Sequence, residues 1–250
     1  MNWLSVYPEI VLLTMACVVT LLDLFVSDPM RKPTYVVTQL TLAVVAAMHF
    51  SDFSAGLTVY AMDRMVVSDP LGHLLGFFAC IAVIAVLVYS RAYAAQREML
   101  NGEFFSLALF SLLGILVMLS ANNFLVIYLG LELMSLSLYA LVALRRDHPP
   151  ATEAAMKFFV LGALASGFLL YGLSMMYGAT GTLDIPEVFK AIATGQINKT
   201  VLAFGLVFIV AGLAFKLSAV PFHMWVPDVY DGAPTPVTLL LRSAPEVAAL

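Results

Sequence analysis

Charged residues and cysteines are both scarce in this 250-residue sequence. Lys and Arg number 12, Asp and Glu number 16, and charged residues make up 11% of a chain that is 62% hydrophobic. A soluble domain of this length needs a charged surface, so the composition argues against one. The two cysteines, Cys17 and Cys80, each stand inside an apolar run, without the spacing of an iron–sulfur or zinc site. We expect them to act as small hydrophobic residues.

Cofactor-binding motifs are missing as well. The sequence contains neither a Gly-rich phosphate-binding loop nor a dinucleotide fingerprint. Its four histidines are scattered along the chain at His49, His73, His148 and His223. We therefore expect no redox centre, no metal and no nucleotide site in this chain.

Long apolar runs dominate the sequence, and its mean hydropathy is +0.97. Runs of about 20 apolar residues predict transmembrane helices. The start has no basic segment, so the first run is expected to be a retained helix rather than a signal peptide. The fold class predicted is all-α, a polytopic transmembrane helical bundle, with spans at 4–22, 34–50, 71–90, 104–121, 123–144, 153–177 and 200–225.

An eighth helix is expected to begin after Pro236, where the sequence runs on only to Leu250. Fourteen residues reach about 21 Å, short of the roughly 30 Å hydrocarbon core. We therefore expect the sequence to be a fragment.

The basic residues of the loops predict the orientation in the membrane. The loops after the first, third and fifth spans carry six of them, and the opposite loops carry three. Because cytoplasmic loops are enriched in Lys and Arg, the N-terminus is expected outside, on the periplasmic side. The first group is Arg31, Lys32, Arg91, Arg97, Arg145 and Arg146, and the second is Arg64, Lys190 and Lys199.

Within the long loop 178–199, residues 182–192 are expected to form an amphipathic surface helix with Leu183, Val188, Phe189 and Ile192 as its apolar face.

Glu132 lies deep in the fifth predicted span, where a charged side chain costs roughly 2.5–3.5 kcal/mol and usually has a partner and a task. At helical spacing Tyr128, Ser135 and Tyr139 share its face, which makes a polar stripe on an apolar helix. The stripe fits a proton or ion site. A carboxyl group that only forms structural hydrogen bonds inside the bundle is the alternative.

Lys216 is the natural counter-charge, within "AGLAFKLSAVPFHMW". Burial disfavours its charged form and a nearby carboxylate favours it, so a movement of Glu132 would make Lys216 bind or release a proton. Pro221 is expected to break the seventh span near 217–221, and irregular backbone at membrane depth lines protein or a hydrated cavity. Alternatively, Lys216 extends its ammonium to the membrane surface.

Three further groups are weaker candidates. His223 follows Lys216 by seven residues and titrates in the range suited to proton transfer, although an interfacial residue is the alternative. Lys157 stands four residues after Glu153, so it fits either a surface ion pair or an inner relay position. Asp228 and Asp231 fall in a Pro-rich turn, where Asp is expected for structural reasons.

Three segments resemble one known family. "AFKLSAVPFHMWVPDVYDGAPTPVT", "YLGLELMSLSLYALVALRR" and "EAAMKFFVLGALASGFLLYG" are similar to the antiporter-like membrane subunits of proton-pumping NADH–quinone oxidoreductase, respiratory complex I, and most of all to bacterial subunit N. The resemblance covers essentially residues 1–240. It implies an antiporter-like bundle with a discontinuous seventh helix, with N-terminal helices at 1–100 and a first antiporter-like repeat at 101–250.

The resemblance also implies roles for named residues and for partners. Glu132, Lys216 and Lys157 match the family's proton-carrying residues, and we expect His223 to join that relay. The chain would then be an obligate component of an enzyme of the bacterial inner membrane. NADH, FMN, iron–sulfur clusters and quinone would be bound by its partner subunits.

Two departures from the family pattern stand out. Family members run to nearly twice this length, and where they usually have a relay lysine this sequence has Glu246, one turn after Arg242. Two alternatives to a proton-pumping subunit remain open at this point. They are a subunit of a multi-subunit cation/proton antiporter and a structural membrane subunit without its own proton path.

Overall fold

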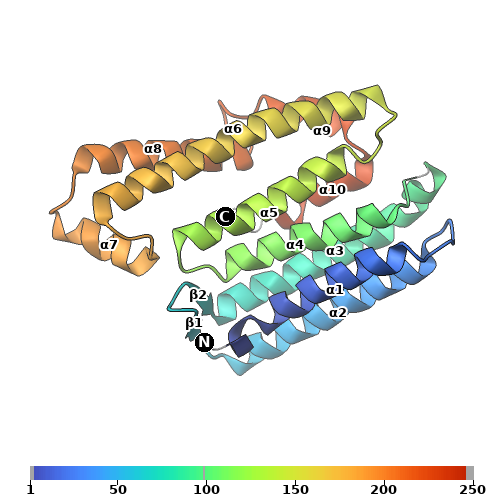
Figure 1. Cartoon of the computed structure of the whole chain (residues 1–250), viewed down its shortest axis with the longest axis horizontal. Coiled ribbons are helices and arrows are strands. Elements are labelled where there is room, and N and C mark those ends of the chain that lie inside the picture. The colour runs from blue at the N-terminus through green and yellow to red at the C-terminus, as the bar shows by residue number, and fades with distance from the viewer. Residues whose placement is uncertain (1–2, 98, 246–250) are drawn as a thin grey trace.

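The computed structural model describes residues 3–97 and 99–245, and these form an elongated bundle of helices with a small hairpin at one end (Figure 1). Within the described residues, six helices are long and apolar enough to cross a membrane: α2, α3, α4, α5, α6 and α8. The all-α class is therefore confirmed. In chain order the elements are η1 (Trp3–Val6), α1 (Tyr7–Asp23), α2 (Lys32–Ala55), β1 (Val59–Ala61), β2 (Val66–Ser68), α3 (Pro70–Gln96), α4 (Gly102–Leu119), α5 (Phe124–Val142), α6 (Pro149–Thr180), α7 (Ile185–Thr194), α8 (Lys199–Lys216), α9 (Trp225–Gly232) and α10 (Thr235–Arg242).

The largest departure from the predicted spans lies at the end of the seventh. The sequence predicted a span over 200–225 with a break near 217–221, whereas α8 already ends at Lys216 and residues 217–224 form turns before α9. Pro221 lacks the backbone N–H that a continuing helix would use, and the Val220–Pro221 peptide bond is cis. The backbone of Ser218 is in the left-handed region, at φ 57°.

The hairpin β1–β2 was not predicted. The two three-residue strands are antiparallel, and Met62, Asp63 and Arg64 turn the chain with positive φ. The Val67 N–H donates to the Ser120 carbonyl at 2.8 Å, so the hairpin is joined to the end of α4. Strands of three residues give too little alternation to stand out beside long apolar runs.

The centre of the bundle is α4, which packs between α5 on one side and α1 and α3 on the other (Figure 1). The α4–α5 contact is closest at Gly114 and Gly130, where a side-chain carbon on Gly114 would lie 2.5 Å from the Gly130 carbonyl oxygen. Helices α6 and α8 meet in the same way at Gly172 and Gly205. Small residues at such contacts let helices approach closely within a membrane.

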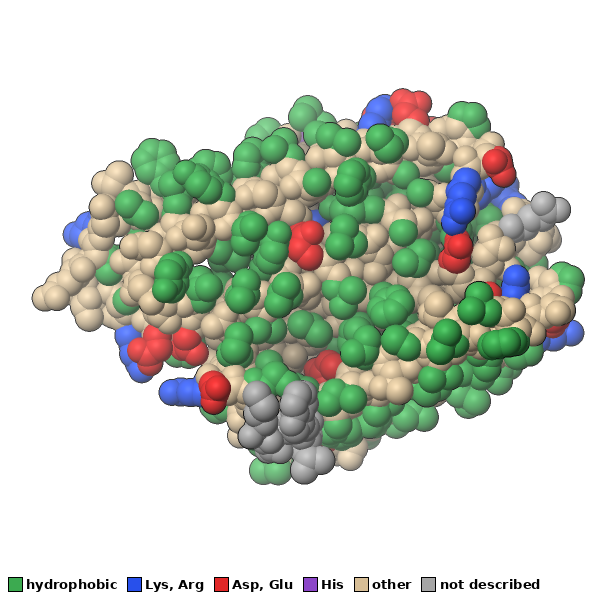
Figure 2. Space-filling view, viewed as in Figure 1, with side chains coloured by type: hydrophobic (Ala, Val, Ile, Leu, Met, Phe, Trp, Pro, Cys, Tyr) green, Lys and Arg blue, Asp and Glu red, His purple; other side chains and the backbone are tan. Residues whose placement is uncertain are grey.

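Apolar side chains also cover the outside of the molecule. Figure 2 shows hydrophobic residues spread over the face in view, with most charged residues toward the ends of the helices. Exposed examples from three helices are Leu21, Tyr89 and Val207. A soluble protein avoids such a surface, whereas lipid requires one.

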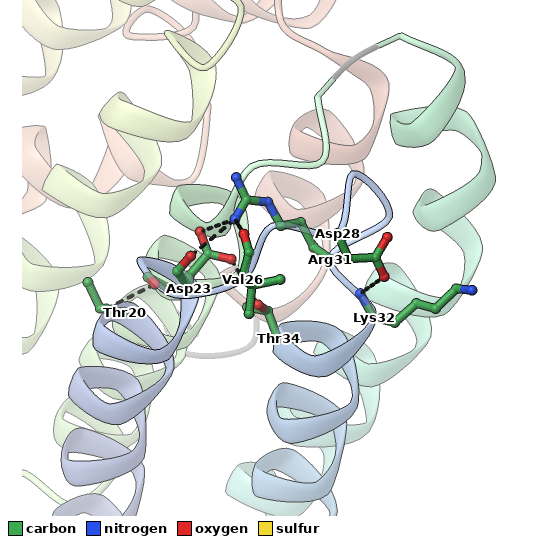
Figure 3. Close-up of polar contacts among 8 residues, drawn as sticks. Thr20, Asp23, Val26, Asp28, Arg31, Lys32 and Thr34 are labelled. Carbon is green, nitrogen blue, oxygen red and sulfur yellow. Dashed lines mark hydrogen bonds and ion pairs between the residues drawn. The ribbon is translucent and has the colours of Figure 1, made fainter.

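The loop between α1 and α2 is held by Arg31, whose Nη1 donates to the Asp23 carbonyl at 3.1 Å and the Val26 carbonyl at 2.7 Å (Figure 3). The same guanidinium lies 3.2 Å from the Asp23 carboxylate, which also accepts a hydrogen bond from Thr34. In the same loop the Met30 N–H donates to Asp28 and keeps the pKa of that carboxyl below its usual value.

The amphipathic helix predicted within the loop 178–199 is confirmed as α7. Its N-terminus is capped by Asp184, whose carboxylate accepts from the Glu187 N–H at 3.2 Å. The Lys190 ammonium donates to Glu187 at 2.7 Å and keeps the pKa of that carboxyl below its usual value. Of the predicted apolar face, Val188 is buried, whereas Phe189 is exposed.

The two asparagines that precede α8 and α4 allow a matched stability test. Asn198 accepts hydrogen bonds from the N–H groups of Thr200 and Val201, whereas Asn101 makes no side-chain capping bond. We expect Asn198→Ala to lower the free energy of unfolding by about 1 kcal/mol, and Asn101→Ala to leave it nearly unchanged. Thermal unfolding of both variants in detergent measures this, and equal losses would show that the cap of α8 contributes nothing.

Candidate functional site

The polar stripe of α5 faces the end of α8. The Lys216 ammonium donates to Ser135 Oγ at 2.6 Å and lies 3.4 Å from the Tyr139 hydroxyl. Ser135 and Tyr139 are 2% and 6% exposed. Ser135 donates its own proton to the Leu131 carbonyl at 2.7 Å, so its oxygen is left to accept from the ammonium. The structure thus brings Lys216 to two groups of α5 that lie about 80 residues before it in the sequence.

Glu132 is close to this group but is not bonded to it. Its Oε1 is buried without a hydrogen-bond partner. Among the described residues, no ion pair within 4.0 Å joins Glu132 to Lys216. The two charges interact at longer range, and Glu132 acts in the same way on Tyr139. Lys216 is therefore held by two neutral oxygens, with the carboxylate as a more distant neighbour.

Aromatic residues close the site around the end of α8. The Trp225 indole N–H donates to the Phe215 carbonyl at 3.1 Å and so occupies a backbone acceptor in the last turn of α8. The Trp225 ring stacks on Phe158 of α6 at 4.7 Å, and Phe158 meets the Tyr139 ring edge-on at 4.7 Å. On α6, Gly162 leaves room for the Tyr139 hydroxyl, which a side chain at that position would overlap.

A small cavity adjoins the ammonium. Its volume is about 30 Å³, and Ser135, Lys216, Ser218 and Tyr230 contribute polar groups to its wall. A cavity of that size with polar groups in its wall is large enough for water. The site can therefore hold an ammonium, neutral acceptors and water in one place, which are the elements that proton transfer needs.

Lys157 lies in a separate ion-pair network at the α6–α9 contact. Its ammonium is 2.8 Å from Glu153 and 2.7 Å from Asp228. The i,i+4 pair that the sequence left as one of two alternatives is present, and all three side chains are partly exposed. The sequence did not predict the contact of Asp228 with Lys157, because an aspartate in a Pro-rich turn is already expected for structural reasons.

His223 lies in the turns between α8 and α9, and it is exposed. Since α8 ends at Lys216, the spacing of seven residues does not place the two side chains on one helix face.

Farther along, Arg242 Nη1 is 3.4 Å from the Tyr230 hydroxyl, which also lines the cavity beside Lys216. Glu246, the departure from the family pattern, lies outside the described residues.

The part of the chain that the structure describes contains no group of three His, Cys, Asp or Glu side chains arranged to hold a metal ion.

The fold and site define a multi-pass membrane protein with a lysine held against a polar stripe inside its helical bundle. Residues 121–250 match the sequence family described as NADH:quinone oxidoreductase/Mrp antiporter, TM, and the chain belongs to this family. It is 63% identical to NADH-quinone oxidoreductase subunit N of Polaromonas naphthalenivorans, over 100% of this chain and 50% of that protein. It is also 63% identical to the subunit N of Herminiimonas arsenicoxydans, over 100% of this chain and 51% of that protein. The resemblance read from the sequence motifs is confirmed.

Solved structures agree with this placement. A chain of respiratory complex I from Thermus thermophilus with bound aureothin superposes with a TM-score of 0.81 at 30% identity, over 97% of this chain and 51% of that one. A chain of the Mrp complex from Dietzia superposes with a TM-score of 0.75 at 20% identity, over 95% and 45%, which shows a common fold. The present chain spans about half the length of the curated relatives it matches.

Proposed function

We propose that this chain is part of a membrane subunit of proton-pumping NADH–quinone oxidoreductase in the bacterial inner membrane. It contributes Glu132, Lys216 and Lys157 to a proton path, with His223 in the turns beyond α8. The observation that carries the proposal is the contact of the Lys216 ammonium with Ser135 and Tyr139 next to a cavity, where Ser135 is one turn along α5 from Glu132. The match to subunit N over the full chain supports the same conclusion.

Helices α8 and α9 are, in this proposal, two halves of one discontinuous span. In a continuous helix, the backbone of residues 217–224 would extend α8 beyond Lys216. These residues form turns instead, and the small cavity adjoins them. Residues 1–100 then supply the N-terminal helices, and residues 101–250 supply the first antiporter-like repeat. The N-terminus lies on the periplasmic side, opposite the loops richest in arginine.

Proton transfer at Lys216 follows from the geometry of its neighbours. The two oxygens that bind Lys216 are neutral, so they favour its charged form less than a carboxylate would. Glu132 is a carboxylate, and its attraction for the ammonium grows as the two groups approach. An approach of Glu132 makes Lys216 take up a proton, and a withdrawal releases it through the cavity. NADH, FMN, iron–sulfur clusters and quinone belong to partner subunits, whose quinone chemistry would drive this movement.

Glu132→Gln and Lys216→Ala, introduced separately into the full-length subunit, test the proposal. Each variant is expected to assemble and yet to lower both the proton-to-electron ratio and the coupled quinone reductase activity of inner-membrane vesicles. Glu187→Gln on α7 is the control, because that carboxylate is paired at the protein surface and lies outside the path. Wild-type ratios in both test variants would rule the path out.

A structural role is the second candidate, and the direct Lys216–Ser135 hydrogen bond favours it, because a buried polar contact can serve only to align two helices. The exchange of both charges, Glu132→Lys with Lys216→Glu, separates the two functions. Full pumping in the exchanged protein would favour alignment. Activity that depends on Na⁺ rather than on NADH would instead indicate a cation/proton antiporter.

A further inference from the structure

Two histidines from different helices are in contact at the end of the bundle that carries the hairpin. His49 of α2 and His73 of α3 are 3% and 6% exposed, and their Nδ1 atoms are 3.0 Å apart. The other nitrogen of His73, Nε2, is 2.8 Å from Ser68 Oγ in β2. A distance of 3.0 Å between two nitrogens is that of a hydrogen bond, so one ring donates its Nδ1–H to the other.

Two polar atoms beside this pair are buried without a hydrogen-bond partner among the described residues: His49 Nε2 and Glu9 Oε2. Both residues line one cavity of about 10 Å³, close to the smallest volume that holds a water molecule. A carboxyl group and an imidazole can satisfy each other in two ways. Either the ring donates to a carboxylate, or a protonated carboxyl group donates to the bare ring nitrogen.

His73 also reaches a second, wider pocket. This pocket has a volume of about 170 Å³ and is lined by His73 and Ser68 together with Tyr7 and Asp52, whose side chains share a hydrogen bond of 2.8 Å. The exposed residue Leu57 forms part of its rim. The histidine pair thus lies between the wider pocket at the hairpin end and the smaller cavity lined by Glu9.

The backbone of α3 is shaped to hold His49. A side-chain carbon on Gly76 would lie 3.0 Å from Cε1 and 3.2 Å from Nε2 of the imidazole. The ring therefore lies flat against the helix where only glycine leaves room. A ring confined in this way has few orientations, so its two nitrogens keep their partners.

We propose that Ser68, His73, His49 and Glu9 form a proton-exchange site between the outer pocket and the buried carboxyl group of Glu9. In the first state His73 Nδ1–H donates to His49, and His49 Nε2–H donates to one water in the cavity, which donates to the Glu9 carboxylate. A proton that arrives at the bare His73 Nε2 displaces the Nδ1 proton onto His49. The water then takes the Nε2 proton of His49 as it gives one of its own protons to Glu9.

The second state is complete in the same way. His73 Nε2–H donates to Ser68, His49 Nδ1–H donates to His73, and the Glu9 carboxyl group donates to the water, which donates to His49 Nε2. Every N–H bond broken is replaced by another, and the net change is one proton moved from the pocket to Glu9. Neither state leaves a buried polar atom unpaired, so the site exchanges a proton without a charge on either imidazole.

The groups that face the pair are acidic or neutral. Around the pair and Glu9 lie Ser5 of η1, Tyr7 of α1, Asp52 of α2, Ser68 of β2, Asp69 at the N-cap of α3, and Ser120 at the end of α4, while Cys80 of α3 lies near Glu9. Acidic surroundings favour arrival of a proton at the pocket. The site does not depend on Glu132 or Lys216, since it lies in the first hundred residues, apart from Ser120.

Nitrogen NMR of the full-length protein in lipid vesicles, with ¹⁵N-labelled histidine, tests the proposal. We expect a coupling between the Nδ1 atoms of His49 and His73. We also expect His49 Nε2 to change from protonated to bare as the pH is lowered. Glu9→Gln should abolish that change, whereas His148→Gln, at the other end of the bundle, should preserve it.

Three results would overturn the proposal: an absent coupling, a His49 tautomer that stays the same at all pH values, or a change that persists in Glu9→Gln. Because the first two are measured on the unaltered protein, a variant that fails to fold does not leave the question open. Uptake of one Zn²⁺ per chain by the pair, with loss of the coupling, would make it a metal site instead.

Discussion

Replacement of Gly114 by alanine is expected to lower the free energy of unfolding by about 1–3 kcal/mol. The added carbon would lie 2.5 Å from both the Gly130 carbonyl oxygen and the Met134 backbone nitrogen, and 2.9 Å from the Met134 side chain. Two of these three neighbours are backbone atoms, which cannot rotate away, so α4 and α5 have to move apart. The loss should exceed the gain of up to about 1 kcal/mol that alanine brings to a helix.

Gly167→Ala is the matched control, because nothing lies within 4 Å of a side-chain carbon at that position in α6. Only the gain in helix propensity remains there, so this variant should be as stable as the parent protein or more so. Thermal unfolding of both variants in the same detergent measures the difference. A Gly114→Ala variant as stable as Gly167→Ala would show that the close approach of α4 and α5 is not needed.

Ser135→Ala is expected to reduce proton pumping strongly, whereas Ser137→Ala should retain it. Both serines are buried in α5 and both bond the carbonyl four residues earlier, at 2.7 Å. Only Ser135 also accepts from the Lys216 ammonium. A hydrogen bond to a charged group contributes about 1.5–3 kcal/mol, which corresponds to roughly a tenfold or larger change in the equilibrium it controls.

The measurement is the initial rate of NADH-driven acidification in inner-membrane vesicles at equal amounts of assembled enzyme. On the proposed function, loss of the acceptor leaves the ammonium with Tyr139 at 3.4 Å as its remaining partner. Equal rates in Ser135→Ala and Ser137→Ala would mean that the contact has no part in proton transfer. A matching drop in assembly of both variants would show that the serines matter only for packing.

The long spans could be predicted from the sequence because their signal is length and hydropathy alone. The helix with Glu132 and the one that ends at Lys216 were placed in this way, and a helical repeat put Ser135 and Tyr139 on one face. Their meeting with Lys216 confirms that α5 turns this face toward α8. The periodicity of one helix is enough to predict its polar face. Because a buried ammonium needs polar neighbours, Lys216 is then expected to lie beside that face.

Other contacts depend on how two helices are rotated against each other, which no single stretch of sequence reveals. His49 and His73 are 24 residues apart on different helices, and each appeared as a lone histidine in an apolar run. Asp228 was predicted to be a turn residue, whereas in the structure it lies in α9 and pairs with Lys157. The hairpin strands were too short to be recognised. Pro221 predicted a break near 217–221 but not the end of α8 at Lys216, one residue before that range.

The indole of Trp225 links the end of α8 to the start of α9. Its hydrogen bond to the Phe215 carbonyl closes the eight-residue connection 217–224 into a ring, so the last turn of α8 and the first turn of α9 are displaced together. Three residues after Trp225, Asp228 holds Lys157 of α6. A short chain of covalent and hydrogen bonds thus joins Lys216 to the Asp228–Lys157 pair, and on the proposed function a shift at one lysine would be transmitted to the other.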